Sequence, residues 1–326
     1  MSDYKTIKGW NIEAVASDPA NPGVGQVWYN STSGTMKAYG YTLGAGSWAA
    51  GGTASTIRRY SSIAGTQTAA VTTGGSPAPI TATELYNGTS WTTSPGTLNS
   101  TTHNTGSLGT QTAAMALGGA SPSLLNETWN GSSWSVNNNL NTVKNYTSGS
   151  GTTTAGMCVG GTPTPATGTA CELYNGSTWT ETNNFNTPRG SMGHSSGPQT
   201  AVLICGGDDW PAPGYNKNTE SWNGTSWTEV NDLNIGKRLM GSGGIQTSMI
   251  VFGGQVSGDA DTTQTEQWNG TSWTEVADLG TGVFGAGGCG TIAASLSAFG
   301  GRPASTLVSE EWTAPSGNTT KTFTAS

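Results

Sequence analysis

Two short motifs recur along the chain at a nearly constant interval. The first is a Gly-Gly pair that ends an apolar run, as in TAAVTTGG and TSMIVFGG. It occurs six times, with successive first glycines 42 to 47 residues apart, at Gly74, Gly118, Gly160, Gly206, Gly253 and Gly300. A fixed period of this length indicates a repeat protein, each repeat being one supersecondary unit that buries its apolar surface against its neighbours.

The second motif has the form E-x-[YW]-N-G-[ST]-[ST]-W. Five copies begin at Glu84, Glu127, Glu172, Glu220 and Glu266. A sixth, Glu310-Glu311-Trp312, lacks the Asn-Gly, and we expect Phe323 to stand in place of its closing Trp. Asn-Gly between two β-type runs favours a tight hairpin with a type I′ turn.

Each repeat is therefore expected to form four strands, the inner one rich in Gly and Ser. The chain has 13 Trp but only 33% hydrophobic residues, which favours many thin layers over one thick core. The predicted core residues are the paired aromatics Tyr86/Trp91, Trp129/Trp134, Tyr174/Trp179, Trp222/Trp227 and Trp268/Trp273. The repeated Glu is expected to pair with a basic residue that precedes the inner strand, namely Arg59, Lys144, Arg189 or Arg238, with His103 at this place in the second repeat.

The order of Gly-Gly, an aromatic residue and a closing Trp resembles the kelch motif over residues 57–326. The resemblance implies an all-β protein, a six-bladed kelch-type β-propeller that follows a small N-terminal β element of residues 1–56. Because kelch propellers include enzymes, adaptors and lectin-like binding proteins, this resemblance does not decide the function.

The N-terminal element contains GQVWYNSTSGTMKAYGY and GSWAAGG, which predict three short strands. The stretch PANPGVGQVWYNSTSGTMK, followed by the repeats, resembles virion structural proteins of marine tailed bacteriophages, including tail-fibre-like proteins. The resemblance implies attachment to other virion proteins, with Trp10, Trp28 and Tyr29 as docking residues. In the alternative, Trp28, Tyr29 and Trp48 pack this element against the propeller, or the element donates a strand to the last blade or forms a divergent seventh blade.

Charge and hydropathy exclude two classes of partner. The formal net charge of -7 repels phosphate backbones and anionic lipid surfaces, so we expect no nucleic acid partner. The first residues hold no apolar run of signal-peptide length, and no later run reaches the ~20 apolar residues of a membrane span. We therefore expect neither Sec export nor membrane insertion, and predict a location on the virion.

The sequence offers little support for catalysis. The only histidines, His103 and His194, occupy different repeats without an evident triad, and there is no Walker loop. The cysteines lack zinc spacing and are expected to be buried free thiols, with a cross-strand Cys158–Cys171 disulfide as the alternative. We therefore predict that the chain is no enzyme and uses no metal or cofactor.

The loops after Gly-Gly are longest in the fourth and fifth repeats, where they read DDWPAPGYNKNT and QVSGDADTTQT. They combine carboxylates with aromatics, a pairing that suits a sugar ring through stacking and hydrogen bonds. The predicted ligand-binding residues are Asp208, Asp209, Trp210, Tyr215, Asp259 and Asp261. The alternative is a solvated polar loop in which Trp210 folds back against its own repeat.

The leading functional hypothesis is a phage virion protein of tail-fibre, adhesin or decoration type, whose propeller binds a host-surface glycan or protein. The first alternative is a purely structural component that contacts only other capsid or tail proteins. The second is a polysaccharide-degrading propeller enzyme, which requires two facing carboxylates.

Overall fold

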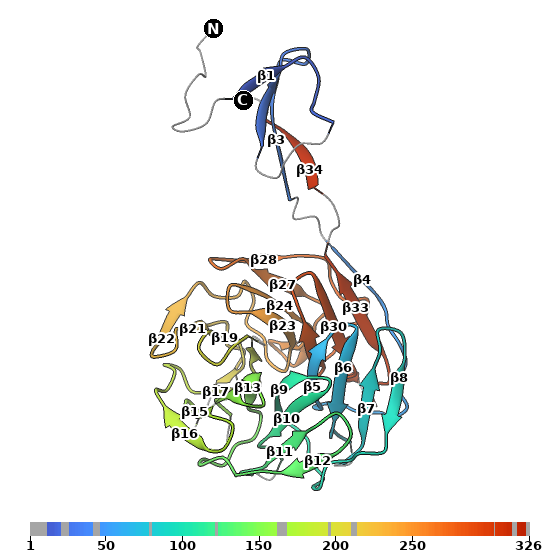
Figure 1. Ribbon diagram of the computed structural model, residues 1–326, viewed down its shortest axis with the longest axis vertical. Coiled ribbons are helices and arrows are strands. Elements are labelled where there is room, and N and C mark those ends of the chain that lie inside the picture. The colour runs from blue at the N-terminus through green and yellow to red at the C-terminus, as the bar shows by residue number, and fades with distance from the viewer. Residues whose placement is uncertain are drawn as a thin grey trace. The chain divides into compact units, whose positions relative to one another are not determined.

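The structure is a computed structural model, and it describes residues 12–20, 26–41, 46–77, 80–120, 123–161, 168–194, 197–209, 214–302, 304–314 and 318–323. The chain divides into two compact units, Ser47–Ala314 and Met1–Gly46 together with Pro315–Ser326 (Figure 1). This division differs from the expected boundary at residue 57. Residues 47–56 belong to the repeat unit, and residues 315–326 join the N-terminal element.

The described residues of the repeat unit form six four-stranded antiparallel sheets. Each inner strand contacts the inner strand of the next sheet, and the last contacts the first, so the sheets form a β-propeller-like ring (Figure 1). The inner strands are β5 (Ser62–Thr66), β9 (Gly106–Thr110), β13 (Ser148–Thr152), β18 (Gly193–His194), β23 (Gly241–Ile245) and β29 (Gly287–Gly290). Their Gly and Ser residues allow these strands to approach one another closely.

The second and third strands carry the repeated motifs. The apolar second strands are β6 (Ala69–Thr73), β10 (Ala113–Leu117), β14 (Ala155–Val159), β19 (Val202–Cys205), β24 (Ser248–Phe252) and β30 (Ala294–Ala298). The third strands, which hold the repeated Glu, are β7 (Thr83–Tyr86), β11 (Asn126–Trp129), β15 (Cys171–Tyr174), β21 (Thr219–Trp222), β27 (Thr265–Trp268) and β33 (Ser309–Thr313).

The outer strands explain how the ring is completed. Five of them follow the third strand directly: β8 (Trp91–Ser94), β12 (Trp134–Val136), β16 (Trp179–Thr182), β22 (Trp227–Val230) and β28 (Trp273–Glu275). The sixth is β4 (Ser47–Ala50), which pairs antiparallel with β33 and sets Trp48 opposite Trp312. The expectation that Phe323 closes the last repeat is wrong, because Phe323 pairs with Met36 in the other unit. The alternative in which the N-terminal region donates a strand is confirmed.

The core consists of layers between neighbouring sheets. One layer contains Val71 of the first sheet together with Ala116, Trp129 and Trp134 of the second. The predicted aromatic pairs are confirmed: both members of each pair are buried, and within each pair the ring centroids lie 4.8 to 5.4 Å apart. Each repeat thus stabilises its neighbour by burying aromatic surface between them.

The repeated Glu is a buried hydrogen-bond acceptor. Glu127, for example, accepts the backbone N–H groups of Asn99 and Ser100 in the connection from the preceding sheet. Three of these Glu residues also form buried ion pairs, Arg58–Glu84, Arg189–Glu220 and Lys237–Glu266. These carboxylates hold adjacent repeats together, as buried polar groups do when their partners are supplied.

The predicted basic partner is correct at Arg189 and wrong in four other repeats, including the second, where Glu127 accepts its hydrogen bonds from Asn99 and Ser100 and His103 forms no ion pair with it. Arg58 and Lys237 form the ion pairs, whereas their successors Arg59 and Arg238 point elsewhere. Successive side chains of an extended backbone face opposite ways, so only one of two adjacent cations can reach the interior. Lys144 is buried, but its ammonium donates to the carbonyls of Gly160 and Ala170.

The hairpin at Asn-Gly differs from the predicted type I′ turn. Tyr86 pairs directly with Trp91, so the loop has four residues, and only Gly88 has a positive φ, of 89°. The Asn87 Oδ1 accepts the N–H groups of Thr89 and Ser90 at 3.0 and 2.9 Å. The Asn side chain therefore organises the loop by replacing a backbone acceptor.

The smaller unit contains one four-stranded sheet in the order β1-β2-β3-β34. Its strands are β1 (Glu13–Val15), β2 (Val27–Asn30), β3 (Thr35–Tyr41) and β34 (Asn318–Phe323). Asp18 accepts hydrogen bonds from Lys37, Asn30 and Trp28, which lower its pKa to about 2. Strands from both terminal regions of the chain thus complete one sheet.

Candidate ligand-binding site

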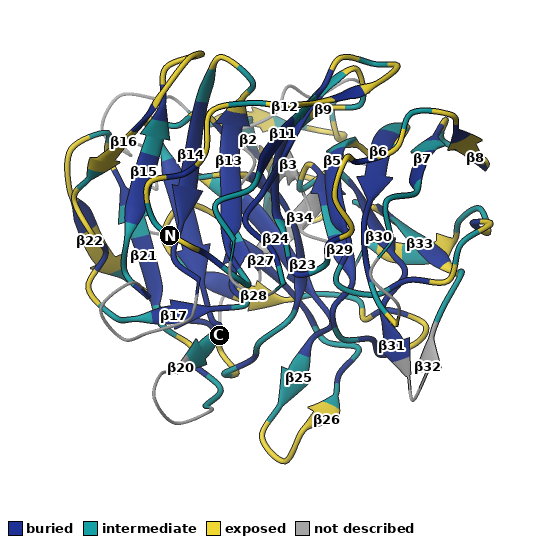
Figure 2. Ribbon diagram, turned by 90° about the horizontal axis from the view of Figure 1, so that it is seen from below, coloured by how far each residue is buried: buried dark blue, intermediate teal, exposed yellow. Residues whose placement is uncertain are grey.

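The connections that follow the Gly-Gly pairs gather at one face of the ring. Three of them contribute to two-stranded ribbons, in which β20 (Asp208–Asp209) pairs with β17 (Arg189–Gly190), β25 (Gln255–Val256) with β26 (Ala260–Asp261), and β31 (Gly301–Arg302) with β32 (Ala304–Ser305). Figure 2 shows β20, β25 and β26 at the same end of the sheets. The Gly-Gly pairs make this possible, because a Cβ on Gly207, whose φ is +109°, would lie 2.5 Å from the Gly190 carbonyl oxygen.

Arg238 joins the connections of the fourth and fifth repeats. Its Nη1 donates to Asp208 Oδ1 and its Nη2 to Asp259 Oδ1, both at 2.5 Å. Its guanidinium carbon also lies 5.2 Å from the centre of the Tyr215 ring. One half-buried cation thus binds two carboxylates and an aromatic face.

Tyr215 and Asp259 lock the two loops together by a reciprocal contact. The Tyr215 hydroxyl donates to Asp259 Oδ1 at 2.6 Å and accepts the Asp259 N–H at 2.8 Å. The hydrogen bond from Tyr215 lowers the pKa of Asp259, and the Arg238 charge acts in the same direction. Asp259 is therefore an exposed carboxylate that stays ionised well into the acidic range.

Asp261 completes this group. Arg238 and Gln255 exchange backbone hydrogen bonds of 3.0 and 2.8 Å, and the Gln255 Nε2 donates to Asp261 Oδ1 at 3.2 Å. We call Asp208, Tyr215, Arg238, Asp259 and Asp261 the rim cluster. Four of the six residues predicted to bind ligand belong to it, although only the sequence proximity of the loops had suggested that they meet.

The other predicted site residues are placed differently. The Asp209 backbone pairs with Arg189 in the ribbon, while the Asp209 side chain, Trp210 and Trp10 lie outside what the structure describes. Of the expected docking residues, Trp28 is fully buried, and its indole donates to Asp18 at 3.1 Å. Tyr29 is 40% exposed. Burial thus leaves Trp28 unable to meet a partner protein as predicted, whereas the predicted docking residue Tyr29 is accessible.

Sequence reasoning missed Arg238 as a member of the site, having assigned it to the repeated Glu. The signal was the pair Lys237-Arg238, since two adjacent cations before an inner strand cannot both face the interior. The pair Arg58-Arg59 behaves in the same way. The Arg59 guanidinium lies 5.3 and 5.4 Å from the centres of the Tyr60 and Phe284 rings.

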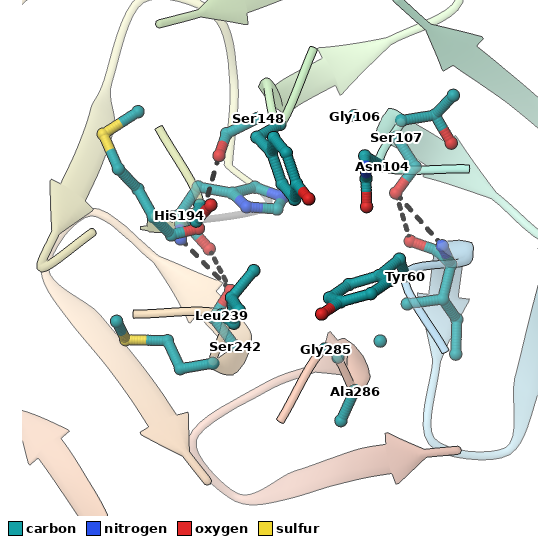
Figure 3. Close-up of a pocket in the computed structure, with 18 of the residues that line it drawn as sticks. Tyr60, Asn104, Gly106, Ser107, Ser148, His194, Leu239, Ser242, Gly285 and Ala286 are labelled. Carbon is teal, nitrogen blue, oxygen red and sulfur yellow. Dashed lines mark hydrogen bonds between the residues drawn. The ribbon is translucent and has the colours of Figure 1, made fainter. Parts of the chain in front are cut away.

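A cavity of about 100 Å³ lies where the inner strands converge, and we call it the axial pocket (Figure 3). Six residues, one before each inner strand, surround it through a cycle of backbone hydrogen bonds of 2.8 to 3.0 Å: Tyr60, Asn104, Tyr146, Ser191, Leu239 and Gly285. All six have a φ between +55° and +63°. Such strain in non-glycine residues persists only when the surrounding structure enforces it, and it concentrates at functional positions.

Of the two histidines, only His194 is among the residues that line this pocket. His194 lies in β18 and lines the pocket, and burial lowers its pKa to about 4. Burial and the charge of Arg59 also lower the pKa of His103. Both imidazoles are therefore neutral at pH 7. Burial raises the pKa of Tyr60 to about 12, so its hydroxyl remains a hydrogen-bond donor.

Among the described residues, no group of three or more His, Cys, Asp and Glu side chains is arranged to hold a metal ion. The same residues include no helix with the length and hydropathy of a membrane span. Comparison with known proteins finds no family model and no curated protein that matches the chain.

Proposed function

We propose that the chain is a six-bladed kelch-type β-propeller that acts as a non-catalytic binding protein, attached to a phage virion and displaying its rim cluster to a host-surface glycan. The six repeats, the six sheets and the cycle of contacts between inner strands support the blade number and the kelch assignment. The attachment to a virion rests on the resemblance of the N-terminal segment to phage structural proteins.

The observation that carries the binding role is the meeting of Asp208, Tyr215, Arg238 and Asp259 from two different repeats. Fixed carboxylates and a guanidinium beside an aromatic ring offer hydrogen bonds and a stacking face, which is what recognition of a sugar requires. The Asp259 side chain is 67% exposed, so a ligand can reach it. Its bonds to Tyr215 and Arg238 fix its orientation before binding, which reduces the entropic cost of association.

The purely structural alternative predicts that this same face is covered by another virion protein. The enzyme alternative requires a proton donor of raised pKa beside an ionised carboxylate. The pKa of Asp259 is shifted in the opposite direction, because Tyr215 and Arg238 stabilise its charged form. Asp259 is therefore unsuited to the role of proton donor, and the rim cluster supports binding better than glycoside hydrolysis.

The experiment that tests the binding role uses the full-length protein on an array of bacterial surface glycans. Tyr215→Phe removes the hydroxyl that holds Asp259, and Arg238→Gln removes the charge that joins the two loops. Lys217→Gln is the matched control, because Lys217 lies in the same connection but pairs only with Asp232, at 3.7 Å. We expect saturable binding that weakens at least about tenfold in the first two variants and stays unchanged in the control.

The outcomes separate the three hypotheses. Absence of glycan binding by the folded protein, together with its detection in purified virions by mass spectrometry, favours the structural alternative. Release of reducing sugar from a bound polysaccharide favours the enzyme. Absence of the protein from purified virions contradicts the proposed location whatever it binds.

A further inference from the structure

We infer that the axial pocket receives the terminal, uncharged sugar residue of the glycan while the rim cluster binds the part of the glycan that follows. This inference rests on the proposed function. It places the terminal sugar against residues that are not part of the rim cluster. It is supported by the shape of the pocket, the absence of charged residues from its wall, and the hydroxyl, amide and aromatic groups that line it.

The shape of the pocket indicates a dead end. A second, separate cavity between the inner strands has a volume of only about 10 Å³, and Ile63, Ser107 and His194 line both cavities. A single water molecule needs about 10–15 Å³ measured in this way, so the second cavity does not admit a sugar. A glycan can therefore enter by one end only, and an internal residue of a long chain cannot occupy the pocket.

The wall of the pocket indicates an uncharged ligand. None of the residues that line it is Asp, Glu, Lys or Arg, and the lowered pKa of His194 keeps its imidazole neutral at pH 7. Transfer of a charged group into such surroundings is costly unless an opposite charge meets it. Hydroxyl groups carry a much smaller cost, since each can be satisfied by hydrogen bonds with the wall.

Hydroxyl and amide groups contribute to the wall of the pocket. Tyr60, Asn104, Tyr146 and Ser191 all line it, and Figure 3 shows Asn104 and Tyr60 directed into the pocket. Hydroxyl and amide groups can each donate and accept hydrogen bonds, so this wall favours a ligand rich in hydroxyl groups.

Aromatic faces line the same space. The Tyr60 and Tyr146 rings stand nearly perpendicular, at 87°, with their centres 6.1 Å apart. A ring face presented to a pocket suits the apolar C–H surface of a sugar, whose hydroxyls point the other way. Asp208 and Arg238 of the rim cluster act electrostatically on both tyrosines, which indicates that the two parts of the site adjoin.

The test measures binding of the full-length protein to immobilised neutral oligosaccharides and its inhibition by free monosaccharides at millimolar concentration. The monosaccharides used are glucose, galactose, mannose, fucose and N-acetylglucosamine. We expect the monosaccharide identical to the terminal residue to inhibit binding. Tyr146→Phe should weaken that inhibition about tenfold by removing one hydroxyl from the wall.

Three further variants make the test specific. Ala286→Leu, which fills the pocket, should abolish monosaccharide inhibition. Tyr215→Phe should weaken oligosaccharide binding without changing the monosaccharide affinity. Tyr29→Phe is the control for loss of a tyrosine hydroxyl outside both parts of the site. Circular dichroism verifies that each variant is folded, and the conservative Tyr146→Phe keeps the test valid if Ala286→Leu does not fold.

The two proposals fail in different ways. Oligosaccharide binding that Tyr215→Phe weakens, but that no monosaccharide inhibits and no pocket variant alters, overturns the inference and leaves the proposed function standing. Equal binding of glycans with a blocked and with a free terminal residue also overturns the inference and leaves the proposed function standing. Absence of binding to any glycan by the wild-type protein overturns both.

Discussion

Trp48 stands directly opposite Trp312 in the ladder between β4 and β33, with ring centroids 5.5 Å apart. The Trp48 indole also donates to the Thr265 hydroxyl at 3.1 Å, across 217 residues of sequence. Trp91, Trp134 and Trp273 donate in the same way to a Ser or Thr hydroxyl of the preceding sheet. An early segment of the chain thus supplies the aromatic contact that the last repeat lacks.

The first prediction concerns this closing strand. Trp48→Ala should lower the free energy of unfolding by about 3 kcal/mol, the lower end of the range for buried aromatics, because Trp48 is half-buried. Phe323→Ala, in the other unit, is the matched control and should leave the unfolding of the repeat unit unchanged. Urea unfolding followed by near-UV circular dichroism measures both. The opposite ranking of the two variants contradicts closure by β4.

The same strand decides which fragment folds. A fragment of residues 47–314 retains β4, whereas one of residues 57–314 lacks it and exposes the edge of β33. Unpaired edges promote association between chains. We expect the shorter fragment to melt at a lower temperature and to aggregate, as measured by scanning calorimetry and light scattering.

The second prediction compares two adjacent arginines. Arg58→Met leaves the Glu84 carboxylate buried without its cation, and the loss of one partner from such a pair typically costs about 3–5 kcal/mol. Arg59→Met removes a half-buried guanidinium stacked on aromatic rings and should cost less than about 1.5 kcal/mol. Chemical denaturation of both variants measures the difference. Similar costs for the two substitutions would falsify the assignment of Arg58 as the partner of Glu84.

The third prediction concerns pH. Burial lowers the pKa of His194 from 6.5 to about 4, so the unfolded chain binds a proton at a higher pH than the folded chain does. Protonation therefore favours the unfolded state as pH falls from about 6.5, and the contribution of His194 to stability is lost by about pH 4. We expect this loss to be on the order of 3 kcal/mol.

Comparison with the variant His194→Gln separates the contribution of His194 to the pH dependence of stability from that of the carboxylates. The free energy of unfolding of the wild type should fall more steeply between pH 7 and pH 4 than that of the variant. Parallel pH profiles for the two proteins contradict the lowered pKa.

The fourth prediction concerns the cysteines. Cys158, Cys171, Cys205 and Cys289 are buried free thiols, as the sequence led us to expect, and burial raises their pKa to about 11 or 12. Because the thiolate is the reactive form, an aromatic disulfide reagent should modify none of them in the native protein and all four after denaturation. Release of only two thiols on denaturation without reductant indicates a disulfide, and Cys158–Cys171 is the pair to examine.

The sequence determined the features that depend on neighbouring residues. The repeat period, the four strands of each repeat and the aromatic pairs all follow from patterns within a few tens of residues. Each Gly-Gly was identified for the same reason, since only glycine adopts the φ values of +67° and +120° seen at Gly74 and Gly75 without strain. The two loops that carry the rim cluster were identified because they are longer than the corresponding loops of the other repeats.

Only the tertiary structure decided the features that depend on which distant groups meet. The third strand of the last repeat is not followed in the sequence by an outer strand that pairs with it, so another segment of the chain takes that place. Trp48 and not Phe323 occupies it, and Trp48 packs there against Thr265 and Phe252. Which of two adjacent basic residues forms the buried ion pair depends on which side chain the backbone directs toward the interior. The contact of Tyr215 with Asp259 and the axial pocket exist only because ring formation brings separate repeats together, and a linear sequence carries no local signal for that convergence.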